Sequence, residues 1–437
     1  MRRNQRGFRK SKYLDRLRFD KKWIRFLSFG VLTLLVLLVC VVVFYHFQVS
    51  NQYKQFLETV EKSLEESTSA SASDADLLAK QEQKQDGDIT FTLTAIGDIM
   101  CHNTQYMDAY VEQTDDYDFS YVFEDVYRYI KNSDIAIGSL ETSFAGKERG
   151  FSNYPTFNSP DQLAFSLKMM GLDVVSTAGN HCLDMGFDGL CRTINVLDEN
   201  DISHLGTYKT QEDRDKILFR FVKGVKIAFI NYTYGTNGIA VPNDMPFCVN
   251  LIDRDLIKCD IDRAKEQGAD MIVACMHWGT EYQTTANKEQ LDLADFLFAN
   301  GVDIILGNHP HVLEPMEKRT VVLEDGSQKT GFVVYALGNF ICDQIAENTR
   351  NSVILNLKVT KSVNGDIHVE HADYVPIYMN KQSGSGVRKM KLLDIEKVIA
   401  AYDLAVLNGV QPAISEEFYG FLRIQLEKII SILGPEF

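Results

Sequence analysis

The sequence of 437 residues predicts an α/β sandwich with helices on its outer faces, and two observations support this fold class. From residue 89 onward, short apolar runs of strand character alternate with stretches whose apolar residues recur at helical spacing. Toward the carboxyl end, strands follow one another without helices between them, which is typical of antiparallel pairing. The expected strands are 89–96, 134–140, 173–178, 217–222, 225–232, 270–276, 303–306, 331–337, 352–360 and 366–375, and the expected helices are 121–132, 161–171, 186–200, 254–267, 288–300 and most of 392–432.

Residues 26–46 are expected to form one transmembrane helix ahead of this domain. Residues 26–45 carry no charge and, at ~1.5 Å per residue, span ~30 Å as a helix, the thickness of a bilayer core. Trp23 and Tyr45 lie near its ends, where interfacial aromatics are common. The run is longer than the apolar core of a usual signal peptide, and residues 46–49 offer no small-residue cleavage site. An uncleaved anchor is therefore favoured over a signal peptide.

The distribution of charge predicts the orientation in the membrane. Residues 1–25 contain eleven Lys or Arg and two Asp, a net of +9, so the remainder of a chain with net charge −15 carries −15 − 9 = −24. Positive charge before the apolar span predicts a cytoplasmic amino terminus and an extracellular large domain on a single-pass membrane protein. The acidic balance of the large domain disfavours nucleic acid as a partner.

The chain divides into five segments of different composition. They are a basic cytoplasmic segment (1–25), the transmembrane helix (26–46), a juxtamembrane stalk and linker (47–88), the α/β domain (89–380) and a helical extension (381–437). Within the stalk, residues 67–88 are rich in Ser and Ala and lack an apolar pattern, as linkers do. Eight cysteines occur without a C-x-x-C motif, and the seven beyond the anchor cannot all pair, so no disulfide framework is expected.

Residues that are able to bind metal ions follow directly on six of the expected strands. They are Asp98, Glu141, Asn180 with His181, His277, His309 with His311, and Asn339. Ligands bind beyond the carboxyl ends of strands in open α/β sheets, so these side chains are expected to surround one or two ions. Pro310 ends the strand before it, and an extended backbone would place His309 and His311 on one side. Taken alone, that stretch is equally compatible with two solvated loop histidines.

Six motifs in this order resemble those of the capsule-synthesis CapA family, which is named for poly-γ-glutamate capsule synthesis and is similar to the calcineurin-like metallophosphoesterases. The motifs are Gly97-Asp98-Ile99-Met100, Ser139-Leu140-Glu141-Thr142, Ala178-Gly179-Asn180-His181-Cys182-Leu183-Asp184-Met185-Gly186, His277-Trp278-Gly279-Thr280-Glu281-Tyr282, Gly307-Asn308-His309-Pro310-His311 and Leu337-Gly338-Asn339-Phe340. The similarity covers roughly residues 90–345. It implies a four-layer α/β/β/α sandwich of the metallophosphoesterase type.

The resemblance also implies roles for individual residues. The implied metal ligands are Asp98, Glu141, Asn180, His277, His309 and His311. Glu141 stands where metallophosphoesterases usually place a bridging Asp, and His181 would be the general acid, oriented by Asp184. Carboxylate, amide and imidazole ligands without thiolate favour Mn, Fe or Zn.

The sequence departs from the superfamily at Met100, where the first motif usually carries a ligating His. His102 is a candidate substitute, although a loop histidine without that role is the favoured interpretation. Glu281 is expected either to support His277 or to be a surface carboxylate. Tyr282 is expected to pack or to form a wall of the substrate site, and Trp278 likewise.

Two other sets of residues have weaker motif context. Asn339 lies at a strand end and is a candidate contact to the substrate or to a ligand, with turn formation as the alternative. His204, His368 and His371 are expected to be structural.

Two classes of function follow. The first is a membrane-anchored, metal-dependent hydrolase of capsule or poly-γ-glutamate biosynthesis, which acts on an exported polymer or a phosphoester with metal-activated water and a His general acid. The second is a non-catalytic capsule-assembly or export factor that binds metal or polymer. The resemblance also implies other capsule-synthesis membrane proteins as partners. A polyanionic polymer would need a metal ion or local cations such as Lys147, Arg149 and Arg192 to bind this acidic domain.

Overall fold

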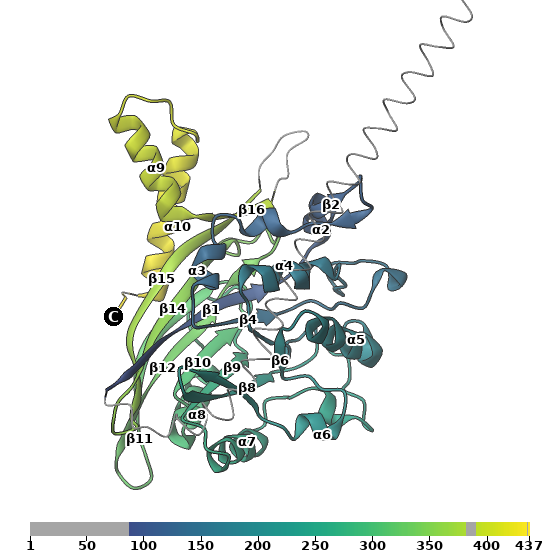
Figure 1. Cartoon of the computed structure of the whole chain (residues 1–437), viewed down its shortest axis with the longest axis vertical. Coiled ribbons are helices and arrows are strands. Elements are labelled where there is room, and N and C mark those ends of the chain that lie inside the picture. Colours follow the sequence, from purple (N-terminus) through teal and green to yellow (C-terminus); the bar gives the residue numbers. More distant parts are fainter. Residues whose placement is uncertain (1–86, 382–389, 435) are drawn as a thin grey trace, which may run out of the picture. The chain divides into compact units, whose positions relative to one another are not determined.

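A computed structural model describes residues 87–381, 390–434 and 436–437. The predicted basic segment, transmembrane helix and nearly all of the stalk lie outside the described residues. Within the described part, no helix is long and apolar enough to cross a membrane. The fold is a mixed α/β structure built on two large sheets (Figure 1).

The larger sheet has eight strands in the order β16-β15-β14-β1-β4-β5-β6, and the short strand β13 also pairs with β1. Strands β1, β4, β5 and β6 run parallel, whereas β14, β15 and β16 add to the sheet in antiparallel pairs. Their bounds are β1 (Ile89–Ile99), β4 (Ile135–Leu140), β5 (Val174–Ser176), β6 (Ser203–Leu205), β13 (Asn339–Ile341), β14 (Asn351–Lys361), β15 (Ile367–Lys381) and β16 (Met390–Asp394).

The second sheet has six strands in the order β11-β12-β10-β9-β8-β7. Its four central strands are parallel, and the two edge strands pair in antiparallel fashion. The bounds are β7 (Leu218–Val222), β8 (Val225–Thr233), β9 (Met271–His277), β10 (Ile304–Asn308), β11 (Leu313–Val322) and β12 (Gln328–Leu337). A separate two-stranded ribbon joins β2 (Tyr110–Val111) to β3 (Asp116–Tyr117).

Helices lie on the outer faces of the sheets and at the carboxyl end (Figure 1). The α-helices are α2 (Asn103–Ala109), α3 (Tyr127–Lys131), α4 (Gln162–Met170), α5 (Gly186–Glu199), α6 (Gln211–Arg214), α7 (Arg254–Glu266), α8 (Lys288–Asn300), α9 (Ile395–Leu407) and α10 (Glu416–Leu433). Three 3-10 turns complete the set, namely η1 (Ser120–Phe123), η2 (Lys147–Arg149) and η3 (Pro246–Cys248).

The alternation of side chains along the strands separates three apolar layers. In β9, Met271, Val273 and Cys275 face a core shared by both sheets, whereas Ile272 and Ala274 face a core covered by α7 and α8. This period of two is what a strand buried on both faces requires. A third core lies between the larger sheet and α3, α4 and η1, so helices cover the outer face of each sheet. The predicted α/β sandwich with outer helices is confirmed.

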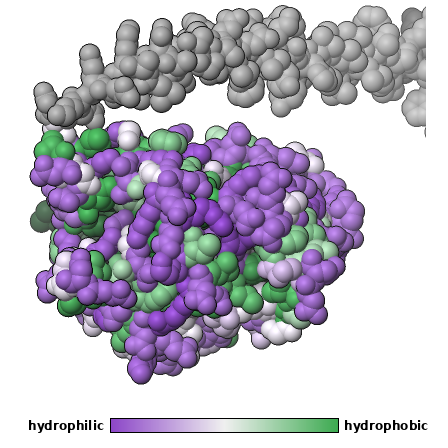
Figure 2. All heavy atoms as spheres, turned by 90° about the horizontal axis from the view of Figure 1, so that it is seen from below, coloured by the Kyte–Doolittle hydropathy of each residue, from purple (hydrophilic) through white to green (hydrophobic). Residues whose placement is uncertain are grey.

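Several elements differ from the sequence-based expectation, among them the short elements α2, β2, β3, β6, α6 and β13, which were not expected. The helix expected at 121–132 is divided into η1 and α3. Strand β11 is not among the expected strands, because Pro315 and several charged residues interrupt its apolar pattern; as an edge strand it tolerates both. Strand β16 extends the larger sheet, so the segment expected as a helical extension from residue 381 includes a strand, and its helices start at Ile395, close to the expected residue 392. The face shown in Figure 2 is mainly hydrophilic, with apolar side chains in small groups between polar ones.

Glycine lets β1 and the loop after β12 approach closely enough to bring their two motifs together. The amide of Asp98 donates to Gly338 O at 2.9 Å, and a Cβ on Gly97 would lie 1.9 Å from that same oxygen. No side chain fits at that distance, so any larger residue at position 97 must displace the backbone on which Asp98 sits.

We therefore expect Gly97→Ala to lower the free energy of unfolding by about 2 kcal/mol, the scale of overpacking in a close-packed interior. Gly420→Ala is the matched control, since Gly420 lies within α10 with open space around its Cα, and removing a helical glycine adds about 0.5–1 kcal/mol. Urea denaturation of the two variants measures both effects. Equal stability of Gly97→Ala and the parent would show that β1 and the loop after β12 do not approach as closely as described.

Candidate metal centre

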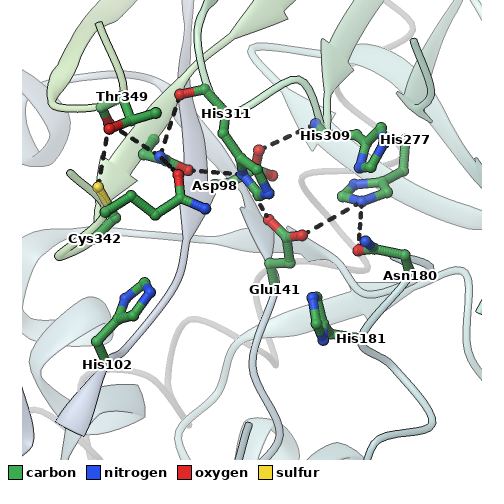
Figure 3. A network of polar contacts seen from close by, with 12 residues as sticks. Asp98, His102, Glu141, Asn180, His181, His277, His309, His311, Cys342 and Thr349 are labelled. Atoms are coloured by element: carbon green, nitrogen blue, oxygen red, sulfur yellow. Dashed lines mark hydrogen bonds and ion pairs between the residues drawn. The ribbon is translucent and has the colours of Figure 1, made fainter. Parts of the chain in front are cut away.

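The carboxyl ends of five strands from both sheets converge on one buried cluster (Figure 3). Asp98 lies in β1, Glu141 follows β4, Asn180 follows β5, His277 ends β9, and His309 and His311 follow β10. Each of the six side chains is buried, with exposed fractions of 0–3%. These are the six residues for which the sequence predicted metal ligation, and the fold brings all of them together.

Glu141 is common to two groups of candidate ligands. One group is Glu141, His277 and His309; the other is Asp98, Glu141 and His311; within each, the ligand atoms all lie within 4.8 Å of one another. The two carboxylate oxygens face different groups, since Oε1 is 3.7 Å from His277 Nε2 and Oε2 is 3.7 Å from His311 Nδ1. This arrangement suits a carboxylate that bridges two neighbouring ions.

Amide side chains complete the cluster on both sides. Asn180 Oδ1 lies 3.0 Å from His277 Nε2 and so points into the first group. Asn339 Oδ1 lies 3.1 Å from His311 Nδ1, while Asn339 Nδ2 donates to the backbone oxygens of His311 and Thr349 at 3.2 and 3.0 Å. These donations fix the Asn339 amide so that Oδ1 faces His311 Nδ1, the same ring nitrogen that lies 3.7 Å from Glu141 Oε2. Asn339 therefore orients a ligand, as one of its two expected roles.

Several buried polar atoms of the cluster have no hydrogen-bond partner. Both carboxylate oxygens of Glu141, one of Asp98, and Nδ1 of His277 and of His309 have no hydrogen-bond partner among the described residues. Leaving a buried carboxylate unpaired costs several kcal/mol, so such groups are normally paired or bind a metal ion. The donor set of carboxylate, amide and imidazole oxygen and nitrogen atoms fits divalent ions.

The shifted pKa values of the cluster are those of carboxylates that are buried without a compensating positive charge. Burial raises the pKa of Asp98 to about 7, and burial together with the charge of Asp98 holds the pKa of Glu141 well above its usual range. Burial lowers the pKa of His309 to about 3 and that of His311 to about 4, and the pKa of His277 lies well below its usual range for the same reason. The histidines are thus neutral at pH 7, as metal binding requires.

The backbone at the two loop histidines differs from the expectation. His309 and His311 have φ of +103° and +62°, so the segment is not extended, and the alternation expected of an extended chain does not explain why their rings converge. Positive φ at two non-glycine residues costs on the order of 1–3 kcal/mol each and is characteristic of functional sites. The amide of His309 donates to Asp98 Oδ2 at 3.1 Å, which ties this strained loop to β1.

His181 lies on the other side of Glu141 from the three histidine ligands (Figure 3). Its Nδ1 is 2.8 Å from Asp184 Oδ2, and that oxygen also accepts from the amide of Phe157 at 2.6 Å. The ring of Phe157 meets the His181 ring edge to face at 4.8 Å. His181 and Asp184 thus form the predicted pair, with Nε2 as the nitrogen available for proton transfer.

Asn237 is a residue of this site that the sequence did not indicate. It lies between β8 and η3 with φ of +50°, and its Nδ2 is 3.2 Å from His181 Nε2. Its Oδ1 accepts from Asn180 Nδ2 at 3.2 Å, which leaves Asn180 Oδ1 directed at His277. Asn237 follows β8 by four residues, as Asn180 follows β5, so the end of the expected strand 225–232 was the sequence signal that could have indicated it.

The remaining predicted residues have less direct places. His102 Nδ1 accepts from the amide of Asp343 at 3.1 Å, and His102 is in neither candidate ligand group. Trp278 is buried and donates from Nε1 to Tyr335 O at 2.9 Å, so it packs the core. Glu281 is exposed, and its charge contributes to the raised pKa of Glu141 after burial and Asp98. Met100 is buried beside Phe157.

The three basic residues named as candidates for binding a polyanion are paired with aspartates. The pairs are Lys147 with Asp115 at 4.0 Å, Arg149 with Asp188 at 3.6 Å, and Arg192 with Asp161 at 2.7 Å. The described cysteines are all free.

The fold and site define a mixed α/β protein with a candidate divalent-metal centre. The family model of the bacterial capsule synthesis protein PGA_cap matches residues 92–344, and the chain belongs to this family. The predicted family is confirmed.

Two relatives from bacilli match most of the chain. The capsule biosynthesis protein CapA of Bacillus anthracis is 29% identical over 318 residues, which is 70% of this chain and 71% of that protein. The PGA biosynthesis protein CapA of Bacillus subtilis (strain 168) is 29% identical over 314 residues, 70% of this chain and 76% of that protein.

Solved structures that are similar to the chain include phosphoesterases and nucleotidases. The calcineurin-like phosphoesterase YfkN from Bacillus subtilis has a TM-score of 0.41 at 17% identity, over 66% of this chain and 90% of that one. The 5'-nucleotidase precursor from Thermus thermophilus has a TM-score of 0.39 at 16% identity, over 78% of this chain and 59% of that one. TM-scores at this level are too low to assign a site or a reaction.

Because Glu141 is shared, we expect its loss to affect both groups of ligands. Glu141→Gln should reduce the metal content of the full chain more than either His309→Ala or His311→Ala, each of which leaves one group intact. His368→Ala is the control, since His368 is exposed and belongs to neither group. Elemental analysis after gel filtration gives ions per chain. Equal metal content in Glu141→Gln and the parent would rule out the shared carboxylate.

Proposed function

We propose that this chain is a metal-dependent phosphoester hydrolase that acts in capsule polymer synthesis at the cell envelope, where the predicted transmembrane helix would hold it. The observation that supports this proposal most strongly is the pair of buried, unpartnered Glu141 oxygens, each facing a different group of ligands. Family membership supports the capsule context. The layers of the fold and the ligand set support a metallophosphoesterase type of sandwich.

The residues divide into those that would hold ions and those that move a proton. Asp98, Glu141, Asn180 and the three histidines His277, His309 and His311 would hold one or two divalent ions. When bound, such ions supply Lewis acidity and lower the pKa of water toward 7. The protein contributes a buried, preorganised pocket in which Asn339 and the amide of His309 fix ligand orientation.

In this proposal, His181 protonates the leaving oxygen. Its Nδ1–H donates to Asp184, which holds the ring with Nε2 as the nitrogen that exchanges a proton. In phosphoester hydrolysis, water adds to phosphorus and loses a proton to solvent, the P–O bond to the leaving group breaks, and Nε2 gives its proton to that oxygen and takes one back from solvent. Asn237 Nδ2 lies 3.2 Å from Nε2 and can only donate to it, so the Asn237 amide must move aside when Nε2 carries the proton that it gives to the leaving oxygen.

We expect His181→Asn to retain metal and fold but to lose ~10²–10⁴-fold in turnover of an alkyl phosphodiester, the usual scale for a general acid. The loss should be much smaller for a p-nitrophenyl phosphodiester, because nitrophenolate departs without protonation. Turnover of both substrates is compared at equal metal occupancy.

His204→Asn provides a matched control, since His204 also faces an aspartate, Asp198 at 3.2 Å, outside the site. It should leave both rates unchanged. Equal losses on the two substrates would mean that His181 positions a group and donates no proton. Bound metal without turnover of either substrate by the parent protein would favour the non-catalytic capsule-assembly factor instead.

A further inference from the structure

Two half-exposed tyrosines stand directly beside the metal centre. Tyr234 follows β8 and is 49% exposed, and Tyr282 closes the motif that starts at His277 and is 46% exposed. Large aromatic side chains are normally buried more deeply, and an exposed ring next to a buried polar cluster is a typical ligand contact. Neither ring belongs to an apolar core of the described residues.

Each tyrosine is held against a different part of the centre. The Tyr234 ring lies 4.5 Å from the ring of His309 and parallel to that of His277, and its amide donates to His277 O at 3.0 Å. The Tyr282 ring lies 6.0 Å from that of His311, and its amide donates to Pro310 O at 2.8 Å. Both rings are therefore fixed by backbone bonds to the segments that carry the ligands.

The backbone of Tyr282 has an unfavourable conformation that neighbouring contacts maintain. Its φ of +65° is in the left-handed region, which is unfavourable for a residue with a bulky side chain. Such strain persists where the neighbouring structure imposes it, here through the bond to Pro310, and it is concentrated at ligand sites. The Tyr282 ring lies beside that of His311 and is half-exposed.

A carboxylate and a third tyrosine act electrostatically on these rings. The pKa of Tyr282 is raised by burial first and then by Glu281 and Tyr154, and the pKa of Tyr234 is raised by burial first and also by Glu281. Glu281 directly precedes Tyr282 in the chain, and Tyr154 is 73% exposed. We call Tyr154, Tyr234, Glu281 and Tyr282 the tyrosine rim.

The rim has no basic partner. Among the described lysines and arginines, none forms a hydrogen bond, ion pair or cation–π contact with a member of the rim or with a candidate ligand. A γ-glutamyl chain carries one carboxylate per unit and would meet Glu281 here, with no described lysine or arginine in contact with the rim. A group that fits must be uncharged, with apolar faces for the rings and hydroxyl edges for the carboxylate and the phenols.

A sugar ring has this combination of surfaces. We propose that the tyrosine rim is a subsite for a sugar unit, and that the phosphoester held at the metal centre is therefore a sugar phosphoester of a glycan or glycan precursor. The rings of Tyr234 and Tyr282 are on separate loops, and the structure shows no ring contact between them. They therefore offer two separate stacking surfaces and do not enclose a single planar base between them. This inference rests on the proposed phosphoester function.

The test compares two phosphonates whose P–C bond resists hydrolysis. Methylphosphonate reports the metal centre alone, and glucosylmethylphosphonate adds a sugar ring. We expect the metal-loaded full chain to bind the glucosyl compound at least tenfold more tightly by isothermal titration calorimetry. Tyr234→Ala and Tyr282→Ala should each reduce this preference by about tenfold, the scale of one lost aromatic face, whereas the Phe variants should retain most of it.

Tyr127→Ala is the matched control, because Tyr127 is 47% exposed in α3 and lies outside the rim. It should leave the preference unchanged. Loss of the preference in the Phe variants as well as in the Ala variants would assign recognition to the hydroxyl groups and overturn the stacking subsite. So would tighter binding of the phosphonate analogues of AMP or phosphocholine, or an unchanged preference in the Ala variants. If methylphosphonate does not bind the metal-loaded chain, the phosphoester function itself fails, and this inference fails with it.

Discussion

The burial of Glu141 is the constraint on which the site depends. Its carboxylate is inaccessible, neither oxygen has a hydrogen-bond partner among the described residues, and a second carboxylate, Asp98, lies in the same cluster. Two buried carboxylates with three neutral imidazoles are unfavourable unless a cation compensates them. A divalent ion would supply that charge, and Glu141 belongs to both groups of candidate ligands.

The site also explains why two sheets are needed. β1, β4 and β5 of the larger sheet bring Asp98, Glu141 and Asn180, and β9 and β10 of the second sheet bring His277 and His309. The apolar core shared by the sheets holds these strand ends in register. Close approach at Gly97 and Gly338 then joins the first motif to the last. Metal ligation and the packing of the two sheets are consequently parts of one structural unit.

Much of this arrangement is predictable from sequence because strands buried on both faces have continuous apolar runs, and the residue that ends each run is polar. That pattern places Asp98, Glu141 and His277 correctly at one edge. It does not indicate β11, whose polar composition is tolerated at a sheet edge, or β16, which is too short to show a clear period. It also misses Asn237 and Tyr234, because both act from a loop whose path depends on tertiary contacts.

The backbone of the loop after β10 shows a different limit. Proline at position 310 correctly indicates the end of the strand, but the positive φ of His309 and His311 results from contacts with Asp98, Tyr282 and Asn339 that are distant in sequence. The alternation of side chains in an extended backbone correctly predicts that the rings of His309 and His311 converge, but the backbone at these two residues is not extended. Long-range hydrogen bonds therefore decide how this loop presents its ligands.

Proton release on metal binding tests the central claim most directly. In the metal-free protein, burial raises the pKa of Asp98 to about 7, so this carboxyl group is largely protonated at pH 6.5, and burial also raises the pKa of Glu141, whereas His309 and His311 are already neutral. Titration of the chelator-treated full chain with Mn²⁺ at pH 6.5, in two buffers of different ionisation enthalpy, counts both ions and protons. We expect binding with release of at least about one proton per chain, and tighter binding as the pH rises toward 8. Absence of Mn²⁺ binding, or binding without proton release, would contradict the account of a buried carboxylate pair that a metal ion neutralises.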